Sequence, residues 1–489
     1  MTDPSFSLPA DPSRRRGSPA APAVVIVGGG PGGYESALVA ARHGADVHLV
    51  DADGIGGAAV LTDVVPSKTL IATAEVLDQV RGSGDLGLRT TRGDDPDTDP
   101  SLRADLGAVN ARVRALAAAQ SADIARSLAE AGVTVHRGHG RLTAPDRVEV
   151  HGVEVQGADG PRSLRADVVL LATGARPREL PSAPVDGERV LTWTQLYSLD
   201  ALPEHLVVVG SGVTGAEFAS AYRALGCRVT LVSSRDRVLP GTDREAADVL
   251  ERAFARRGVV VRSRSRADRV VRDGDTVRVV LTSGEEILAS HVLMAVGAVP
   301  ATEGLGLDEA GVRRTASGHV EVDRVSRTNV GGIYAAGDCT GVLPLASVAA
   351  MQGRIAMHHA LGDAVAPLLT RQVAQAVFTA PEIASVGVSE AEVEAGEVAG
   401  ETRLLALATN PRAKMQGIEE GFVRIVVAPG AGTVLGGVVV SPRASELIHP
   451  LALAVTHRLT ADELAAAFTV YPSVSGSLAE VARRVPQHT

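Results

Sequence analysis

The sequence predicts an α/β protein built around two parallel sheets, and three observations lead to this. A strand, a glycine turn, a helix and a second strand follow one another in AVVIVGGGPGGYESALVAARHGADVHLVD, residues 23–51. The same order and the same glycine spacing return in LVVVGSGVTGAEFASAYRALGCRVTLVSSR, residues 206–235. Two apolar runs, residues 166–181 and 291–300, supply further strands that end in glycine. Strands alternating with helices indicate parallel sheets, because parallel neighbours need a crossover connection.

Composition limits the function classes. The chain has 489 residues, 48 basic and 57 acidic side chains, a formal net charge of −9 and only 2% aromatic residues. At about 150 residues per domain the length predicts three domains. A nucleic-acid surface would need basic stripes and stacking rings, so we expect no nucleic-acid partner. No apolar run reaches the roughly 18 residues of a membrane helix, so we expect no membrane span.

The chain has two cysteines, Cys227 and Cys339. They are too few for a disulfide framework or a thiolate metal cage, which favours a reducing, cytoplasmic location. Residues 1–22 are interpreted as a disordered tail, with a secretion signal as the alternative. His358 and His359 lie in a helical Ala/Met context without a third ligand at metal-binding spacing, so no metal site is expected.

Gly28, Gly30 and Gly33 form a GxGxxG turn between the first strand and its helix. In such a turn the first glycine permits the tight bend, the second lets a pyrophosphate approach the backbone and the third lets helix and strand pack closely. The helix N-terminus then faces the phosphates. Asp51 closes the next strand, where a carboxylate can accept hydrogen bonds from an adenosine ribose.

The second unit repeats this turn with Gly210, Gly212 and Gly215, and it differs at the end of the second strand. Ser233 takes the place of Asp51 and is followed by Ser234 and Arg235. No acid stands at the place of Asp51 to repel a ribose 2′-phosphate, and Arg235, with Arg237 farther on, can supply a guanidinium to meet it. NADPH is therefore predicted over NADH, with NADH still possible. The alternative is that Arg235 is a solvated surface charge.

The remaining segments complete the expected organisation. Residues 81–100 are polar and rich in Gly, Asp and Pro, which is typical of an exposed loop before an Ala-rich helix at 105–131. Residues 328–341, TNVGGIYAAGDCTG, combine a strand, a glycine turn and the start of a helix. From about residue 366 strand and helix signals alternate to the end of the chain.

After about residue 22 the chain resembles the flavoprotein disulfide reductases, the lipoamide dehydrogenase and glutathione reductase family. The resemblance rests on GGGPGG, VVPSK, ATGARP, GSGVTGAE, IYAAGD and VFTAPEIASVG. It implies two Rossmann-like domains, for FAD and for NAD(P)H, and a C-terminal α+β dimerisation domain that pairs two subunits. The implied boundaries are 23–182 and 302–365 for the FAD domain, 183–301 for the NAD(P)H domain and 366–489 for the dimerisation domain.

The resemblance also implies roles for single residues. Lys68 and Glu217 look like the family's ion pair beside the nicotinamide and flavin N5, where a fixed ammonium stabilises negative charge on the reduced ring. An ordinary surface lysine is the alternative for Lys68. The expected cofactor contacts are Gly28, Gly30, Gly33, Asp51, Gly57, Lys68, Thr173, Gly174, Gly210, Gly212, Gly215, Glu217, Ser233, Ser234, Arg235, Gly297, Gly337, Asp338 and Ala346.

The chain departs from the family where the family's redox disulfide would stand. In GGAAVLTDVVPSK, residues 56–68, Ala59 and Val64 occupy the two cysteine positions. Near the C-terminus Tyr471 and Gly476 stand where the family has its acid/base His and the Glu that holds it. The loss of the whole thiol machinery is similar to the actinobacterial NAD(P)H:quinone reductases that lack these cysteines.

The expected activity is therefore that of an NAD(P)H:quinone oxidoreductase, in which electrons pass from NADPH through FAD directly to a quinone. Ala59, Val64 and Tyr471 would line the quinone cavity, and Tyr471 could donate a proton or be a core tyrosine at the dimer seam. A flavoprotein scaffold or regulatory partner with little turnover is the alternative function. A true disulfide reductase conflicts with the missing cysteines, and a metal ion or oxygen as acceptor is not separated from a quinone.

Overall fold

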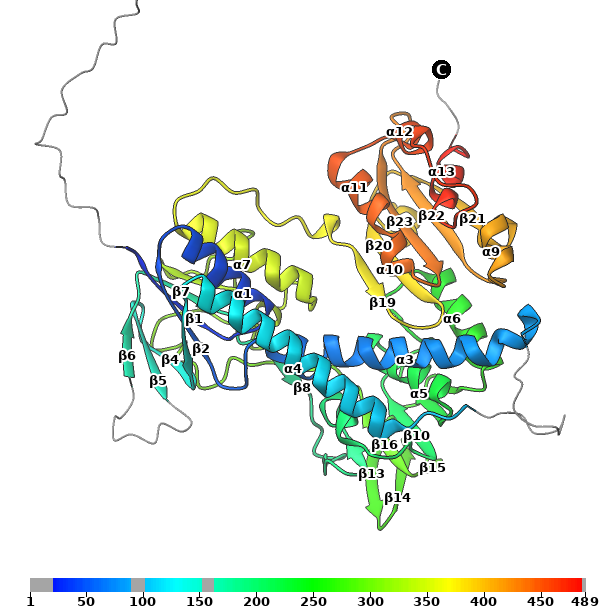
Figure 1. The fold of residues 1–489 in the computed structure, drawn as a ribbon, viewed down its shortest axis with the longest axis horizontal. Coiled ribbons are helices and arrows are strands. Elements are labelled where there is room, and N and C mark those ends of the chain that lie inside the picture. Colours follow the sequence, from blue (N-terminus) through cyan, green and yellow to red (C-terminus); the bar gives the residue numbers. More distant parts are fainter. Residues whose placement is uncertain (1–20, 89–101, 152–161, 486–489) are drawn as a thin grey trace, which may run out of the picture.

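The computed structural model describes residues 21–88, 102–151 and 162–485. The predicted tail lies outside this range except for its last two residues, and so does much of the predicted loop at 81–100. Figure 1 shows three groups of elements, two of them built on parallel sheets and one formed by the C-terminal part of the chain. The predicted α/β class is confirmed.

The first sheet is parallel and has the strand order β18-β7-β1-β2-β3. Its strands are β1 (Ala23–Val27), β2 (Asp46–Asp51), β3 (Thr134–Arg137), β7 (Val168–Leu171) and β18 (Ile333–Ala335). The residues of β7 and β18 are buried because both faces of the sheet are covered. Helices α1 (Pro31–Arg42) and α7 (Ala346–Ala360) pack against each other beside it. Strand β18 brings a distant segment of the chain back into this sheet.

The second sheet repeats the parallel arrangement with the order β12-β11-β10-β16-β9. Its strands are β9 (Val190–Leu191), β10 (His205–Val209), β11 (Arg228–Val232), β12 (Val260–Arg262) and β16 (His291–Met294), with helices α5 (Val213–Leu225) and α6 (Arg244–Arg256). Smaller antiparallel pieces are β4 (His139–Ala144), β5 (Arg147–His151) and β6 (Arg162–Arg165), then β13 (Ala267–Asp273), β14 (Thr276–Leu281) and β15 (Glu286–Ala289). A two-stranded ribbon of β8 (Ala175–Pro177) and β17 (Ala298–Pro300) connects the two parallel-sheet regions.

The C-terminal part forms an antiparallel sheet with the order β19-β20-β23-β22-β21. Its strands are β19 (Gln375–Val377), β20 (Glu382–Gly387), β21 (Glu401–Ala406), β22 (Phe422–Val427) and β23 (Val434–Ser441). Its helices are α8 (Glu390–Glu394), α9 (Pro411–Met415), α10 (Ala444–Leu447), α11 (His449–His457), α12 (Ala461–Ala466) and α13 (Gly476–Ala482).

Two long helices cross the middle of the molecule in Figure 1, α3 (Val64–Gly82) and α4 (Leu106–Glu130), preceded by the short α2 (Gly57–Leu61). Helix α4 confirms the helix predicted at 105–131, and the Asp105 carboxylate caps it by accepting a hydrogen bond from the Ala108 N–H. Buried Leu70 of α3 belongs to one apolar core together with Phe218 of α5 and Phe422 of β22. Helix α3 thus packs against the second parallel-sheet region and the C-terminal sheet.

A buried arginine adds an electrostatic link between the C-terminal sheet and the second parallel-sheet region. Arg424 of β22 forms ion pairs with Asp243 and with Glu245 at 2.6 Å, at the start of α6, and with Glu390 at 2.6 Å. Its guanidinium is almost inaccessible, so the surrounding carboxylates must balance its charge. Among the helices of the described ranges, none has both the length and the apolar character required to cross a membrane.

Candidate active site

The glycine turn of the first unit lies at the carboxyl edge of the first sheet. A Cβ on Gly28 would lie 2.3 Å from the carbonyl oxygen of Ala172, and one on Gly33 would lie 1.8 Å from that of Gly28. Gly30 is different, because its added Cβ would meet only the Gly57 Cα, at 4.0 Å. The first and third glycines therefore allow backbones to pack, and the second leaves room for a ligand at the N-terminus of α1.

Asp51 holds this turn in place. One oxygen of its carboxylate accepts a hydrogen bond from the Gly29 N–H at 2.6 Å, and the other accepts from Asp53 and Gly54. Burial raises the pKa of Asp51, and these three backbone N–H donors oppose that rise. The predicted ribose contact thus comes from a carboxylate that also fastens the glycine loop to β2.

Other predicted contacts follow neighbouring strands of the same sheet. Thr173 and Gly174 follow β7, and Gly337 and Asp338 follow β18, so they share the carboxyl edge with the glycine turn. Burial raises the pKa of Asp338. Ala346 is the first residue of α7. Gly57, whose Cβ would meet Gly30, completes the group around the turn.

The second glycine turn has the same geometry. A Cβ on Gly210 would lie 2.1 Å from the Ala295 carbonyl oxygen, one on Gly215 would lie 1.9 Å from that of Gly210, and one on Gly212 would meet nothing within 4 Å. Gly297 follows β16 at the same sheet edge, with a positive φ of 95°. Both units therefore leave open space beside the middle glycine at a helix N-terminus, a place that suits a dinucleotide pyrophosphate.

The end of β11 differs from the end of β2. The Ser233 side chain is fully buried and its hydroxyl is 2.7 Å from that of Ser211, whereas Ser234 and Arg235 are exposed. Sequence reasoning missed a second arginine here: the Arg264 N–H donates to the carbonyl oxygen of Arg235 at 2.7 Å. Arg264 comes from the segment after β12, and no local pattern pointed to it. Two exposed arginines thus flank this strand end, and Ser233 belongs to the internal network beneath them.

Lys68 and Glu217 come together as a partly buried ion pair. Lys68 Nζ lies 2.7 Å from Glu217 Oε2, and the Glu217 side chain is only 4% exposed, against 29% for Lys68. The other oxygen of Glu217 accepts a hydrogen bond from the Phe378 N–H at 3.0 Å, and the Phe378 ring centroid lies 4.7 Å from Lys68 Nζ. Lys68 is on α3, Glu217 on α5 and Phe378 directly after β19, so each belongs to a different part of the fold. Phe378 lies in the VFTAPEIASVG motif, which had been given no role.

Asp63 is a further acid that sequence reasoning missed. It stands at the N-cap of α3, but its carboxylate makes no capping hydrogen bond to that helix. Burial raises the pKa of Asp63 to about 6, the charge of Lys68 lowers it, and the charges of Glu217 and Asp338 raise it further. Asp63 therefore sits among the same charges as the ion pair. The available signal was its place directly before Val64, which the family resemblance aligns with a cysteine of the disulfide reductases.

Tyr471 is not joined to this group within one chain. Its side chain is 84% exposed, and Phe468 and Val470 beside it are exposed as well. Ala59 lies on α2 and Val64 opens α3, which places both beside Asp63 along the chain. Any contact of Tyr471 with Ala59, Val64 or Lys68 would have to come from a second subunit.

Both cysteines are buried and unpaired. Burial raises the pKa of Cys227 to about 12 and that of Cys339 to about 11. Such thiols stay protonated near neutral pH, so neither is a reactive thiolate.

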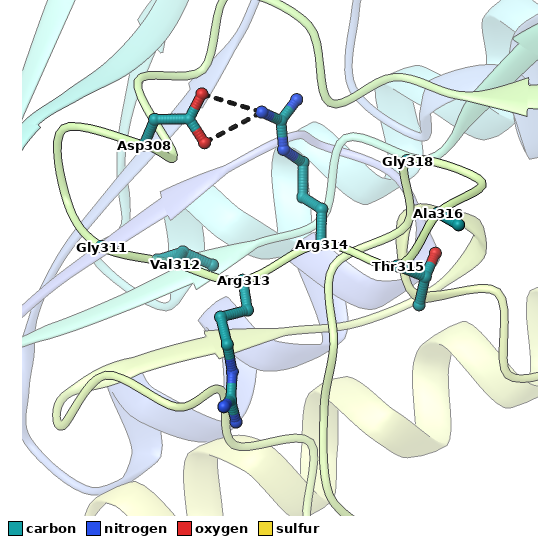
Figure 2. A pocket seen from close by; sticks show the side chains of 8 residues that line it. All are labelled: Asp308, Gly311, Val312, Arg313, Arg314, Thr315, Ala316 and Gly318. Atoms are coloured by element: carbon teal, nitrogen blue, oxygen red, sulfur yellow. Dashed lines mark hydrogen bonds and ion pairs between the residues drawn. The ribbon is translucent and has the colours of Figure 1, made fainter.

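A hollow on the surface, shown in Figure 2, has a different lining. It is formed by residues 308–318, and Arg314 points to Asp308, whose two oxygens lie 2.9 and 2.8 Å from one guanidinium nitrogen. Arg313 points the other way and pairs with Glu321 at 3.4 Å. The two arginines are thus balanced by acids, and the hollow shares no lining residue with the site around Lys68.

Known proteins match the chain along most of its length. Residues 22–353 match the pyridine nucleotide-disulphide oxidoreductase family, and residues 373–482 match the dimerisation domain of pyridine nucleotide-disulphide oxidoreductases. An NAD(P)H dehydrogenase (quinone) of Mycobacterium tuberculosis is 54% identical, covering 95% of this chain and 94% of that protein. A dihydrolipoyl dehydrogenase of Chlorobaculum parvum is 35% identical, covering 94% of this chain and 96% of that protein. The crystal structure of LpdA from M. tuberculosis superposes with a TM-score of 0.89 at 52% identity, covering 96% of this chain and all of that one.

The half-buried carboxyl group of Asp63 makes the stability of the folded chain depend on pH. Its pKa is about 6 in the fold and 3.8 ordinarily, so ionisation destabilises the fold as pH rises from about 4 to above 6. Asp63→Asn cannot ionise, so we expect it to avoid this loss. The difference in free energy of unfolding between the variant and the wild type should therefore be about 2–3 kcal/mol more favourable to the variant at pH 7.5 than at pH 4. Urea unfolding at both pH values measures the gain. Exposed Asp53→Asn is the control, and an equal gain there would contradict the assignment.

Proposed function

The chain belongs to the pyridine nucleotide-disulphide oxidoreductase family, and from this premise we propose that it is a flavin-dependent NAD(P)H dehydrogenase that reduces a quinone without a redox disulfide. The family implies FAD and NAD(P) as its cofactors. One observation carries the proposal: the Lys68–Glu217 pair is intact, while Ala59 and Val64 stand where the thiol relay would begin.

The residues present fit the two dinucleotides. Gly30 and Gly212 each leave open space at a helix N-terminus, a cradle that a larger side chain would fill. Asp51 and Asp338 supply carboxylates at the edge of the first sheet for the FAD ribose and ribityl groups. When bound, FAD accepts hydride from NAD(P)H and supplies reducing equivalents to the acceptor.

Lys68 holds a positive charge at a fixed place beside the ring-binding edge. Because Glu217 balances it and the Phe378 ring covers it, the ammonium keeps its position and remains partly shielded from water. A preorganised cation stabilises the negative charge that arrives with a hydride. A flavoprotein scaffold would use the pair only to hold the parts of the chain together, so reduction of the flavin by NADPH is the observation that separates the enzyme from this alternative.

The acceptor side is proposed to be completed by a second subunit. The C-terminal match is to a dimerisation domain, and Phe468, Val470 and Tyr471 form a run of exposed apolar side chains that suits such a seam. A homodimer would bring Tyr471 of one subunit toward Ala59 and Val64 of the other. These walls are apolar and fit a flat quinone. Two buried, unpaired cysteines agree with a reducing cytoplasm as the site of action.

Quinone reduction also consumes a proton, and we assign its delivery to Asp63. With a pKa of about 6, Asp63 can donate a proton near neutral pH and take one back. Phenols ionise near pH 10, so a tyrosine is the slower acid there. Tyr471 is then a wall of the quinone cavity that can donate a hydrogen bond.

The first test is an anaerobic absorbance titration of the purified enzyme. We expect NADPH to bleach the yellow flavin band without a thiolate charge-transfer band, and one equivalent of a benzoquinone to restore it. Lipoamide is the control and should restore nothing, because no redox disulfide is present. A flavin that stays oxidised under excess NADPH would favour the scaffold, and reoxidation by lipoamide would favour a disulfide reductase.

The preference for NADPH is expected to depend on Arg235 and Arg264. Each exposed guanidinium can form a charge-assisted hydrogen bond with the 2′-phosphate, which contributes about 1.5–3 kcal/mol. Arg235→Ala and Arg264→Ala should each raise the KM for NADPH about 10–100-fold and leave that for NADH unchanged. Steady-state kinetics with both nucleotides measure this. Arg237→Ala, whose guanidinium faces Asp236, is the matched control, and an equal rise there would contradict the assignment.

Proton delivery is tested by comparing two variants. We expect Asp63→Asn to lower kcat for quinone about 100-fold, because a general acid contributes at least that much, and Tyr471→Phe to change kcat only slightly. Stopped-flow measurement of the quinone step separates this loss from the nucleotide step. A larger loss of kcat in Tyr471→Phe than in Asp63→Asn would contradict this assignment and identify the Tyr471 phenol as the proton donor.

A further inference from the structure

Three metal-ligating side chains meet where α1 and α7 end. His43 Nε2 lies 3.2 Å from Asp363 Oδ2, and His358 Nδ1 lies 2.7 Å from the same oxygen. The two imidazole rings meet edge to face with their centroids 5.2 Å apart. His43 comes from the end of α1, while His358 and Asp363 come from the end of α7 and the residues after it. The spacing of His358 along the sequence offered no third ligand, and the packing of the two helices supplies two partners.

The backbone that carries these side chains is fixed by two helix C-caps of the same kind. At the end of α7 the Asp363 N–H donates to the His358 carbonyl oxygen at 2.9 Å, and Gly362 has a positive φ of 96°. At the end of α1 the Ala45 N–H donates to the Ala40 carbonyl oxygen at 3.1 Å, and Gly44 has a positive φ of 76°. These are Schellman motifs, in which the chain turns back over the last helical turn. This turn places Asp363 next to His358.

The two helices are also packed too closely to slide past each other. A Cβ on Gly353 of α7 would lie 2.2 Å from the carbonyl oxygen of Gly32 in α1. Farther along, Arg354 forms an ion pair with Glu35 at 3.1 Å. Figure 1 shows α1 and α7 side by side, which agrees with their extensive contact. The relative position of His43 and His358 is therefore set by rigid elements.

The donor set and its spacing suit a borderline divalent ion. The donor atoms of the three side chains all lie within 4.8 Å of one another. Ligands at 2.0–2.1 Å around a tetrahedral Zn²⁺ are about 3.3 Å apart, so small side-chain rotations suffice to close the site. Two imidazoles and one carboxylate favour Zn²⁺, Ni²⁺ or Cu²⁺ over Mg²⁺ and Ca²⁺, which prefer oxygen ligands. The three side chains are 30–43% exposed, so an ion can reach them.

The electrostatic setting also favours a cation. Both helices direct their C-termini toward this cluster, and a helix C-terminus carries a partial negative charge. We propose that His43, His358 and Asp363 form a binding site for a divalent transition-metal ion of the zinc class, with water as its fourth ligand. The ion clips the end of α1 to the end of α7, away from the glycine turn at the start of α1. Its role is to stabilise this helix pair, and it takes no part in the redox chemistry.

The test is isothermal titration of the chelator-treated, flavin-loaded enzyme with zinc chloride. We expect one Zn²⁺ per chain, and His43→Gln and His358→Gln should each lower the affinity at least about tenfold, since even outer ligand-supporting residues have effects of that size. His136→Gln is the matched control, because His136 belongs to another histidine pair, 3.0 Å from His48, and should leave binding unchanged. Zinc K-edge absorption of the loaded wild type should report two imidazole nitrogens.

Melting temperatures distinguish a loss of zinc binding from misfolding of a variant. Zn²⁺ should raise the melting temperature of the wild type and of His136→Gln, and leave that of His43→Gln unchanged, because an ion that binds only the native state stabilises it. Melting temperatures in chelator show whether each variant is folded. Absence of saturable zinc binding to the wild type, or binding that persists in both His43→Gln and His358→Gln, would overturn the proposal.

Discussion

The ion pair between Lys68 and Glu217 is the interaction around which the three parts of the chain are arranged. A carboxylate that is 4% exposed needs compensation for its lost hydration, and Glu217 receives it from the Lys68 ammonium and the Phe378 N–H. These partners come from α3 and from the start of the C-terminal sheet. Separating the three parts would therefore leave a buried charge unpaired, which ties their relative positions to one another.

The charge around this pair is unbalanced, and the imbalance has a chemical use. Burial is the main reason that the pKa of Asp63 rises to about 6, because a partly dehydrated site disfavours the charged carboxylate. The charges of Glu217 and Asp338 raise the pKa of Asp63, and the ammonium of Lys68 lowers it. In the proposed mechanism Lys68 is the fixed cation for arriving negative charge, and Asp63 supplies the proton.

The two parallel sheets show how one architecture is adapted to two nucleotides. Both place an open glycine at a helix N-terminus, and they differ at the end of the second strand. In the first sheet Asp51 fastens the glycine loop through the Gly29 N–H and accepts two more hydrogen bonds from Asp53 and Gly54, directly after β2. In the second sheet a buried serine, Ser233, leaves the outer edge to Arg235 and Arg264. The two units therefore share one fold and differ in the charge at the end of the second strand.

Local patterns were enough to predict the fold class, the two glycine turns and helix α4, because strand and helix periodicity, capping and motif identity are local properties of the chain. The absence of the redox cysteines was predicted from the family resemblance. The same resemblance also pointed to Lys68 and Glu217 and to a quinone-reducing relative. Four features followed from tertiary packing and not from local patterns: the partial burial of Asp63, the hydrogen bond from the Phe378 N–H to Glu217, the approach of Arg264 to Arg235 and the contact of His43 with His358. These depend on which distant segments pack together and on how much water they exclude. Contacts between distant segments produce no repeating pattern in the sequence, so the sequence could not predict them.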